Sequence, residues 1–443
     1  MQKAMERQYV LYTKYGNFTW DVVFGNLLQD ATMYVKKLLH IDDHYLKQHH
    51  AGIINTSMPS ANPDSASLAE GTKYTVEFGH NSHELISRIF STTFDRILAS
   101  SCHKPLTIVT TDTEFYSMTR QINRLSEINS DRINIVVVKV QPIHSFQNRL
   151  CEEIEKQHRI GHAIDFVYVS QITFLQHTVI ADIRSFVPAV RHALEKSGPP
   201  AGGPPGTGPI VIVDGYHSFG AFDISLHGLD CIFVAGALKH IGAGPNLAFV
   251  VYPDKYATMR PASTGWLADV SVLGPGSAGI SVGSSVAYTP GLSLMGSTPS
   301  FTSSVILFNE VMALWKSHAV DLHFVHQHVM AMQKRFLDGL AHQRISNHGN
   351  KYINMTKIVK TSRFSDDPSD LRLEDESVRS HTLVFEQASA ADAAEAVSSL
   401  ADHRIACDCR KVYVRLGFGL KHNPEDVDRL LKALEYNGHN ENY

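Results

Sequence analysis

An acid and a lysine follow two successive apolar segments of the chain and could share one catalytic crevice. Asp214 comes directly after the β-branched run Ile210–Val213, in the string IVIVDGYHSFG, and His217 follows three residues later. Lys239 comes after the run Cys231–Ala235, in the string CIFVAGALKH. In an open α/β sheet, ligands bind outside the carboxyl ends of the strands, so both side chains are expected to face one crevice. A structural ion pair at the sheet edge is the alternative explanation.

These two residue types suit one kind of cofactor chemistry. A lysine amine forms a Schiff base with an aldehyde cofactor, and pyridoxal 5'-phosphate (PLP) pairs such a lysine with an acid at its pyridinium nitrogen. The acid keeps that nitrogen protonated, so the ring accepts electrons from the substrate Cα. Asp214 and Lys239 have the types and the order that this arrangement requires.

Such residues need a sheet to position them, and the middle of the chain has the pattern of one. Short apolar runs alternate with amphipathic stretches long enough for crossover helices, as at 114–125 and 180–195. Runs of this kind are typical of strands buried on both faces. We therefore predict an α/β fold with a mostly parallel sheet. The predicted strands are Leu106–Thr111, Ile133–Val140, Ile164–Val169, Ile210–Val213, Cys231–Ala235 and Leu247–Tyr252.

The last third of the chain predicts one long helix followed by a smaller α+β unit. The helical pattern runs from Ser303 to about Ala341. Ser389 and Asn423 are predicted N-caps of two later helices, and Pro424 suits a first helical position. The elements predicted after the long helix are a strand at Thr382–Glu386, a helix at Ala390–Ala401, a strand near Val412–Leu416 and a helix at Pro424–Glu435.

Composition limits the classes of protein to consider. The 443 residues include 43% hydrophobic and 19% charged residues, and the net charge of −4 shows no basic excess of the kind that nucleic-acid binders carry. The sequence has no apolar run fit to cross a bilayer, no secretory signal pattern and no disulfide framework among its five cysteines. We expect a cytoplasmic protein without nucleic-acid or membrane partners. Its predicted regions are an N-terminal segment (1–60), a large cofactor-binding domain (61–300), and a connecting helix with a small domain (301–443).

Sequence patterns for other cofactors are weak. The string from Gly242 to Pro245 lacks the third glycine of a dinucleotide-binding motif. Cys407 and Cys409 form a single close pair, which does not make a zinc site. A cluster of histidines in the long helical pattern has no ligand carboxylate, which favours a solvated helix face; its members are His323, His326 and His328. We predict no metal site.

Five segments resemble the class V, fold-type I PLP-dependent enzymes, and among them kynureninase and kynureninase-like proteins. The most specific is Val213–Val250, which matches D-x-x-H-S-x-G followed by K-x-x-x-x-G-P. The resemblance covers roughly residues 20 to 436, and the stretch that precedes this region in the family is expected to be short or missing here. It implies the fold-type I fold and a homodimer with shared active sites. The other segments are Val76–Arg88, Thr110–Gln121, Ser263–Val272 with Gly296–Ser300, and Ile405–Val427.

The resemblance implies catalytic roles by position. Lys239 would hold PLP as a Schiff base and then shuttle the Cα proton. Asp214 would pair with the pyridinium nitrogen, and His217 would lie near the phenolic oxygen of the cofactor. Arg415 would grip the substrate carboxylate with its bidentate guanidinium.

The resemblance also implies residues that only bind the cofactor. Phe115 would stack on the ring face. Ser82 and His83 would reach the phosphate, helped by the N-terminus of the helix that begins there. Trp266 and Thr298 are similar to groups that contact the phosphate, the threonine typically from the partner subunit.

The activity implied by the resemblance is that of a lyase or hydrolase that acts on an α-amino acid. A kynureninase-like enzyme would hydrolyse a Cβ–Cγ bond or eliminate a β-substituent such as a thiol. However, Leu238 stands where kynureninases carry a tyrosine before the lysine. Cys407 and Cys409 lie near the place of a cysteine desulfurase's reactive cysteine, but within a kynureninase-type C-D-x-R string. The alternatives are an aminotransferase, an epimerase, a cysteine desulfurase, a bond-forming enzyme of a specialised pathway, or a non-catalytic scaffold.

Overall fold

The computed structural model divides into two compact units. Residues Met1–Gln171 and Ala181–Ala319 form the first unit, and residues Ile172–Ile180 and Val320–Tyr443 form the second. The described residues are 2–15, 22–41, 72–95, 105–180, 182–196, 203–204, 207–269, 272, 279–295, 302–345, 358–359 and 379–436.

A seven-stranded sheet forms the core of the first unit, in the order β1-β7-β6-β5-β4-β2-β3. Strands β6, β5, β4, β2 and β3 pair in parallel, whereas β7 is antiparallel to both β6 and β1. The predicted mostly parallel sheet is therefore confirmed, with every predicted strand present and β1 added. The strands are β1 Tyr74–Gly79, β2 Leu106–Thr111, β3 Ile133–Val138, β4 Ile164–Ser170, β5 Ile210–Asp214, β6 Ile232–Gly236 and β7 Ala248–Pro253.

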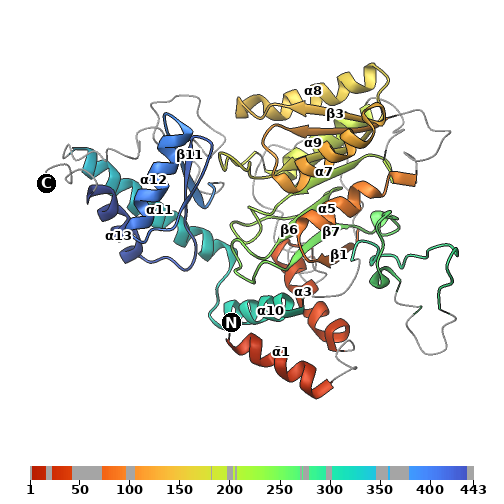
Figure 1. The fold of residues 1–443 in the computed structure, drawn as a ribbon, viewed down its shortest axis with the longest axis horizontal. Helices are drawn as coiled ribbons and strands as arrows, with labels where there is room; N and C mark the ends of the chain where they lie inside the picture. The colour runs from red at the N-terminus through yellow and green to blue at the C-terminus, as the bar shows by residue number, and fades with distance from the viewer. Residues whose placement is uncertain are drawn as a thin grey trace, which may run out of the picture. The chain divides into compact units, whose positions relative to one another are not determined.

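The strand sequences are almost entirely apolar because most of the strands are covered on both faces. Every residue of β2, β4, β5, β6 and β7 is buried, and Figure 1 shows helices lying along the sheet. The first-unit helices are α1 Gln2–Tyr15, a π-helical turn Val23–Leu27, α3 Leu28–Leu38, α5 Ser82–Ser91, α7 Tyr116–Ile128, α8 Phe146–Arg159, α9 Ile183–Lys196 and α10 Thr302–Ser317. Short 3-10 turns lie at Ser130–Arg132, Ile143–Ser145, Asp254–Tyr256 and Trp266–Ala268.

The second unit is built on an antiparallel sheet in the order β10-β11-β9-β8. Both predicted caps are present: Ser389 Oγ accepts from the Asp392 N–H at 3.1 Å, and Asn423 Oδ1 accepts from the Asp426 N–H at 2.9 Å. The elements of the second unit are α11 Leu322–Ile345, β8 Ile358–Val359, β9 Thr382–Glu386, α12 Ala390–Asp402, β10 Asp408–Arg410, β11 Tyr413–Gly417 and α13 Pro424–Tyr436.

No described helix of the chain has the length and apolar character needed to span a membrane.

The single long helix predicted from Ser303 to Ala341 is wrong. The pattern is broken into α10 and α11, with Ala319 between them at a φ of 52°. Asp321 Oδ1 accepts from the Phe324 N–H at 2.7 Å, so this acid caps the start of α11. An unbroken apolar periodicity across the two helices hid that cap.

The solvated face predicted for the helix histidines is also wrong for His326. Its side chain is buried, and its Nδ1 lies 3.1 Å from Nε2 of His381, with the two rings stacked. His328 is half-buried, and its Nε2 lies 2.7 Å from the carbonyl oxygen of His422. Among the residues that the structure describes, no cluster of metal-ligating side chains suits a metal ion.

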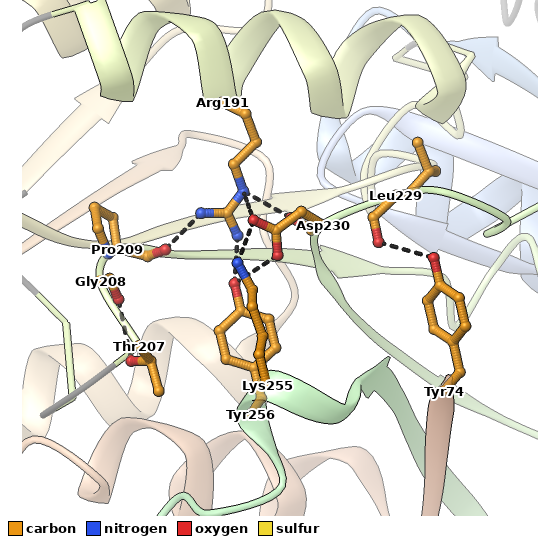
Figure 2. A network of polar contacts seen from close by, with 9 residues as sticks. All are labelled: Tyr74, Arg191, Thr207, Gly208, Pro209, Leu229, Asp230, Lys255 and Tyr256. Atoms are coloured by element: carbon orange, nitrogen blue, oxygen red, sulfur yellow. Dashed lines mark hydrogen bonds and ion pairs between the residues drawn. The ribbon is translucent and has the colours of Figure 1, made fainter. Parts of the chain in front are cut away.

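A buried charged network joins three strands at one edge of the first-unit sheet (Figure 2). Arg191 of α9 lies 3.1 Å from the Asp230 carboxylate, and it donates to the Pro209 carbonyl at 2.6 Å and to the Tyr256 hydroxyl at 2.6 Å. Lys255 also pairs with Asp230. Pro209 precedes β5 and Asp230 precedes β6, whereas Lys255 and Tyr256 follow the antiparallel β7. The network therefore fixes the edge opposite to the carboxyl ends of β5 and β6.

Replacing Arg191 with methionine is expected to destabilise the protein by about 3–5 kcal/mol, because it removes the buried one of the two cations that pair with the Asp230 carboxylate. Urea unfolding measures the loss. The matched control is Arg124→Met, which removes an exposed ion pair to Glu127 and should cost less than about 1 kcal/mol. An equal effect of the two substitutions would contradict a stabilising role for the network.

Candidate active site

Asp214 is the last residue of β5, and its carboxylate is buried at the carboxyl edge of the sheet. The Tyr168 hydroxyl, from β4, donates to Oδ2 at 2.6 Å, and the Tyr216 backbone N–H donates to Oδ1 at 2.9 Å. Burial raises the pKa of Asp214, and the two hydrogen bonds oppose that rise by favouring the ionised form. The acid is thus held in a fixed orientation by donors on both oxygens.

Lys239 lies on the loop that leaves β6 at this same edge. Strands β5 and β6 are parallel neighbours in which Asp214 pairs with Val234. Lys239 is exposed and comes three residues after the last residue of β6. His240 Nε2 lies 3.0 Å from the carbonyl oxygen of the half-buried His217. This contact ties the loop of Lys239 to the loop of His217, so the predicted catalytic residues of the first unit gather at one edge.

Two glycines allow these loops to approach each other. A Cβ on Gly236 would lie 2.4 Å from the Tyr216 ring, so that ring packs directly against the end of β6. Gly220 has a φ of +81°, and a Cβ there would lie 2.7 Å from the Ile241 side chain. Glycine is therefore required at both positions.

A second buried acid, Glu114, lies at this edge and was missed by the sequence analysis. It belongs to the turn between β2 and α7 and accepts from the Thr111 hydroxyl at 2.6 Å and from the Ser170 N–H at 3.2 Å. Burial raises the pKa of Glu114 to about 7, and the nearby Asp214 carboxylate adds to the rise. The rule that selected Asp214, an acid just past the carboxyl end of a buried strand, also selects Glu114.

The predicted ring-stacking and phosphate-binding residues lie on two helix starts. Phe115 immediately precedes α7, and its ring is partly exposed. Ser82 begins α5 and is buried, whereas His83 is exposed and lies beside Gln121 of α7. Since β1 runs in the same direction as β6, α5 begins at the edge that carries Asp214. Helix starts favour anions, and at this one the Asn81 side chain caps the Glu84 N–H at 2.9 Å.

The remaining predicted site residues do not lie on these two helix starts. Trp266 begins a 3-10 turn and is partly exposed, and Thr298 lies outside the described residues. Arg415 belongs to β11 of the second unit and is buried. Its Nε donates to Asp408 Oδ1 at 2.7 Å, and a second nitrogen donates to Oδ2 of the same carboxylate. A further nitrogen of Arg415 donates to the Phe174 carbonyl at 2.7 Å.

The fold of the chain is similar to that of solved structures at low sequence identity. The cystine C–S lyase C-DES, in complex with its reaction product cysteine persulfide, matches with a TM-score of 0.64 and 11% identity over 98% of this chain and 93% of that one. A lysine-to-alanine mutant of C-DES, with glycine covalently linked to the PLP cofactor, matches with a TM-score of 0.64 and 12% identity over 98% and 92% of the two chains. The chain has the fold of fold-type I PLP-dependent enzymes.

A third match is the cysteine desulfurase CsdA from Escherichia coli, with a TM-score of 0.55 and 13% identity over 82% of this chain and 78% of that one. No protein-family model and no curated protein sequence matches the chain. The likeness confirms the predicted fold class, while a particular closeness to kynureninase stays a prediction.

Replacing His240 with alanine is expected to loosen the Lys239 loop and to change the acid sensitivity of the protein. The variant loses the contact with the His217 carbonyl, which should lower the free energy of unfolding by about 1–3 kcal/mol. Desolvation lowers the pKa of His240 from 6.5 to about 4. The unfolded chain therefore binds a proton first, and native stability is lost as the pH falls from 6.5 towards 4.

Urea unfolding at pH 7 and pH 5 tests both effects, with the exposed His192→Ala on α9 as the control. The His240 variant should show a smaller loss of stability between the two pH values than the wild type. The same pH dependence in both proteins would contradict the assignment of a neutral, desolvated His240.

Proposed function

We propose that this protein is a PLP-dependent lyase that cleaves a bond at Cβ of an α-amino acid, with a Cβ–S bond as the first choice. The observation that carries the proposal is the placement of a buried acid, Asp214, and an exposed amine, Lys239, at the carboxyl ends of two adjacent parallel strands. The fold around them is the one shared with the C–S lyase C-DES.

The residues at this edge fit the chemical groups of PLP. The buried carboxylate of Asp214 suits a protonated pyridine nitrogen, and the amine of Lys239 suits an aldehyde carbon. The partly exposed ring of Phe115 offers a face for stacking. The start of α5, with Ser82 and His83, suits a phosphate. From the family pattern we add Trp266 and Thr298 as further phosphate contacts. When bound, PLP supplies a ring that accepts the electrons left on Cα.

The protein's own residues would orient the reacting groups and move protons. The Tyr168 hydroxyl and the Tyr216 N–H hold both oxygens of Asp214, so the acid keeps one orientation towards the ring nitrogen. Lys239 would take the proton from the substrate Cα and return it later. His217 would tune the cofactor's phenolic oxygen from the loop that His240 holds.

The described cysteines favour a lyase over a desulfurase. A desulfurase needs a reactive thiolate that takes up sulfur. Burial raises the pKa of Cys407 to about 11, with a smaller contribution from Asp408, so this thiol stays protonated at neutral pH. Cys409 lies in β10 and packs against the apolar core of the second unit. A lyase that releases sulfur as product needs no such protein thiol, and Leu238 lacks the hydroxyl expected of a kynureninase.

The variant Lys239→Ala is expected to lose covalent cofactor attachment and turnover while keeping its fold. Protein supplied with PLP should absorb visible light, and borohydride reduction should fix the cofactor to a peptide that contains Lys239. The exposed Lys156→Ala on α8 is the matched control. A wild-type protein without the band, or a Lys239 variant with full activity, would overturn the proposal.

The products identify the bond that is cleaved. Elimination from L-cystine or another sulfur-substituted alanine gives pyruvate, ammonia and a sulfur product, whereas a desulfurase gives alanine. Kynurenine hydrolysis also gives alanine, together with an aromatic acid. Pyruvate formed only by the protein with Lys239 intact supports the lyase, and alanine as the main product would replace it with one of the other two activities.

We further propose that Arg415 binds the substrate carboxylate. The two carboxylate oxygens of Asp408 accept from Nε and Nη2, which form one edge of its guanidinium, and the guanidinium carbon lies 5.1 Å from the centroid of the Phe174 ring. A substrate carboxylate would therefore compete with Asp408 for the same two N–H donors. The pairing makes Asp408 the residue that sets how tightly Arg415 can bind a second anion.

The variant Arg415→Ala is expected to raise KM for a carboxylate-bearing substrate by at least about tenfold, because a charge-assisted bidentate interaction is lost. Asp408→Asn should lower KM, since it removes the competing charge. Steady-state kinetics measures both, with the exposed Arg429→Ala as the control. An unchanged KM in the Arg415 variant, or an equal rise in both variants, would leave Arg415 with a structural role only.

A further inference from the structure

Asp408 lies between two arginines on one face of the second-unit sheet. Asp408 and Arg415 are directly opposite each other in the β10–β11 register, so their side chains share a face. Arg410 comes two residues after Asp408 in β10 and therefore points to the same face. Asp408 Oδ2 accepts from Nη2 of Arg415, and it also lies 3.3 Å from Nη2 of Arg410. One carboxylate thus contacts two guanidinium groups.

The two arginines differ in burial. The Arg415 side chain is 8% exposed, whereas those of Arg410 and Asp408 are 42% and 44% exposed. Arg415 meets the carboxylate with two hydrogen bonds, and Arg410 meets it through one longer contact. The Phe174 ring borders both cations, with its centroid 5.1 Å from the Arg415 guanidinium carbon and 5.9 Å from that of Arg410. A carboxylate that left Arg415 for Arg410 would therefore move from a buried cation to one that water also solvates.

Arg415 itself is held by the segment Ile172–Ile180. Its Nη1 donates to the Phe174 carbonyl at 2.7 Å and lies 3.3 Å from Nε2 of His177. With Nη1 engaged in this way, the edge formed by Nε and Nη2 is the one suited to a bidentate carboxylate, and Asp408 holds that edge. Asp408 must therefore move before a second carboxylate can bind Arg415 through two donors.

We propose that Arg410 is a positioning residue that receives the Asp408 carboxylate when a substrate carboxylate takes its place on Arg415. This inference rests on the role proposed above for Arg415. Before the exchange, Asp408 contacts both arginines; after it, Asp408 pairs with Arg410 alone and the substrate pairs with Arg415. Each carboxylate keeps a cation throughout, so the release of Arg415 costs less than it would if Asp408 passed into water alone.

The test measures carboxylate binding rather than turnover. The probe is 3-(methylthio)propionate, which has the carbon and sulfur skeleton of S-methylcysteine but no amine to react with PLP. Isothermal titration calorimetry on the PLP-loaded protein gives its dissociation constant. Arg410→Gln is expected to raise that constant by about two- to fivefold, because the exchanged Asp408 loses a half-exposed partner. Arg410→Lys keeps the charge and should stay close to the wild type. The matched control is Arg429→Gln, which removes an exposed cation of α13.

A double-mutant cycle separates the exchange from simple attraction of the anion by Arg410. In an Asp408→Asn background no carboxylate has to be received, so Arg410→Gln should raise the dissociation constant by clearly less than in the wild-type background. An equal rise in the two backgrounds would overturn the proposal. A greater loss of binding for the dicarboxylate 3,3'-dithiodipropionate than for the monocarboxylate would also overturn it, since Arg410 would then bind a second substrate carboxylate.

A crystal structure of the wild-type protein with the probe tests the same step without any substitution. It should show the probe on Nε and Nη2 of Arg415 and the Asp408 carboxylate on Arg410. Asp408 still bound to Arg415 beside a bound probe would overturn the exchange.

Failure of this inference can be told from failure of the proposed function. Unchanged probe binding in Arg415→Ala would overturn the substrate-binding role of Arg415 and the exchange with it. Weakened binding in Arg415→Ala together with unchanged binding in Arg410→Gln would overturn the exchange alone.

Discussion

The desolvation of one carboxylate, that of Asp214, constrains the rest of the first unit. A buried ionised carboxylate is costly unless donors replace its water. The donors here come from two places, the Tyr168 hydroxyl on the neighbouring strand and the Tyr216 N–H of the following loop. The Tyr168 hydroxyl can reach Asp214 only while β4 and β5 keep their parallel register. The candidate site therefore depends on strand pairing as much as on the acid itself.

A second set of contacts holds the strands at the opposite end of the sheet. The Arg191 network joins the residues before β5 and β6 to those after β7, so these three strands are held at the end away from Asp214 (Figure 2). The ionic groups at this edge are paired with opposite charges, whereas burial raises the pKa values of the acids at the candidate site. The fold thus separates one end of the strands, where buried charges are paired, from the other end, where two buried acids have raised pKa values.

The sequence predicted the parts of the fold that depend on local pattern. The six apolar runs could be recognised because strands buried on both faces carry almost no polar residues. The break at Ala319 was missed because the apolar periodicity continues on both sides of it. The partner of Arg415 could not be predicted, since Asp408 reaches it through the β10–β11 pairing. Glu114 was overlooked although its position after β2 resembles that of Asp214 after β5.

The path of the chain links the acid pair to the arginine. Strand β4 ends at Ser170, which Glu114 holds, and the segment Ile172–Ile180 that follows belongs to the second unit. In that segment Phe174 offers its carbonyl and its ring face to Arg415, and His177 lies 3.3 Å from the same guanidinium. The chain therefore passes within a few residues from the strand end that carries Ser170 to the segment whose carbonyl and ring contact Arg415, so the sequence 170–177 contributes contacts to both units.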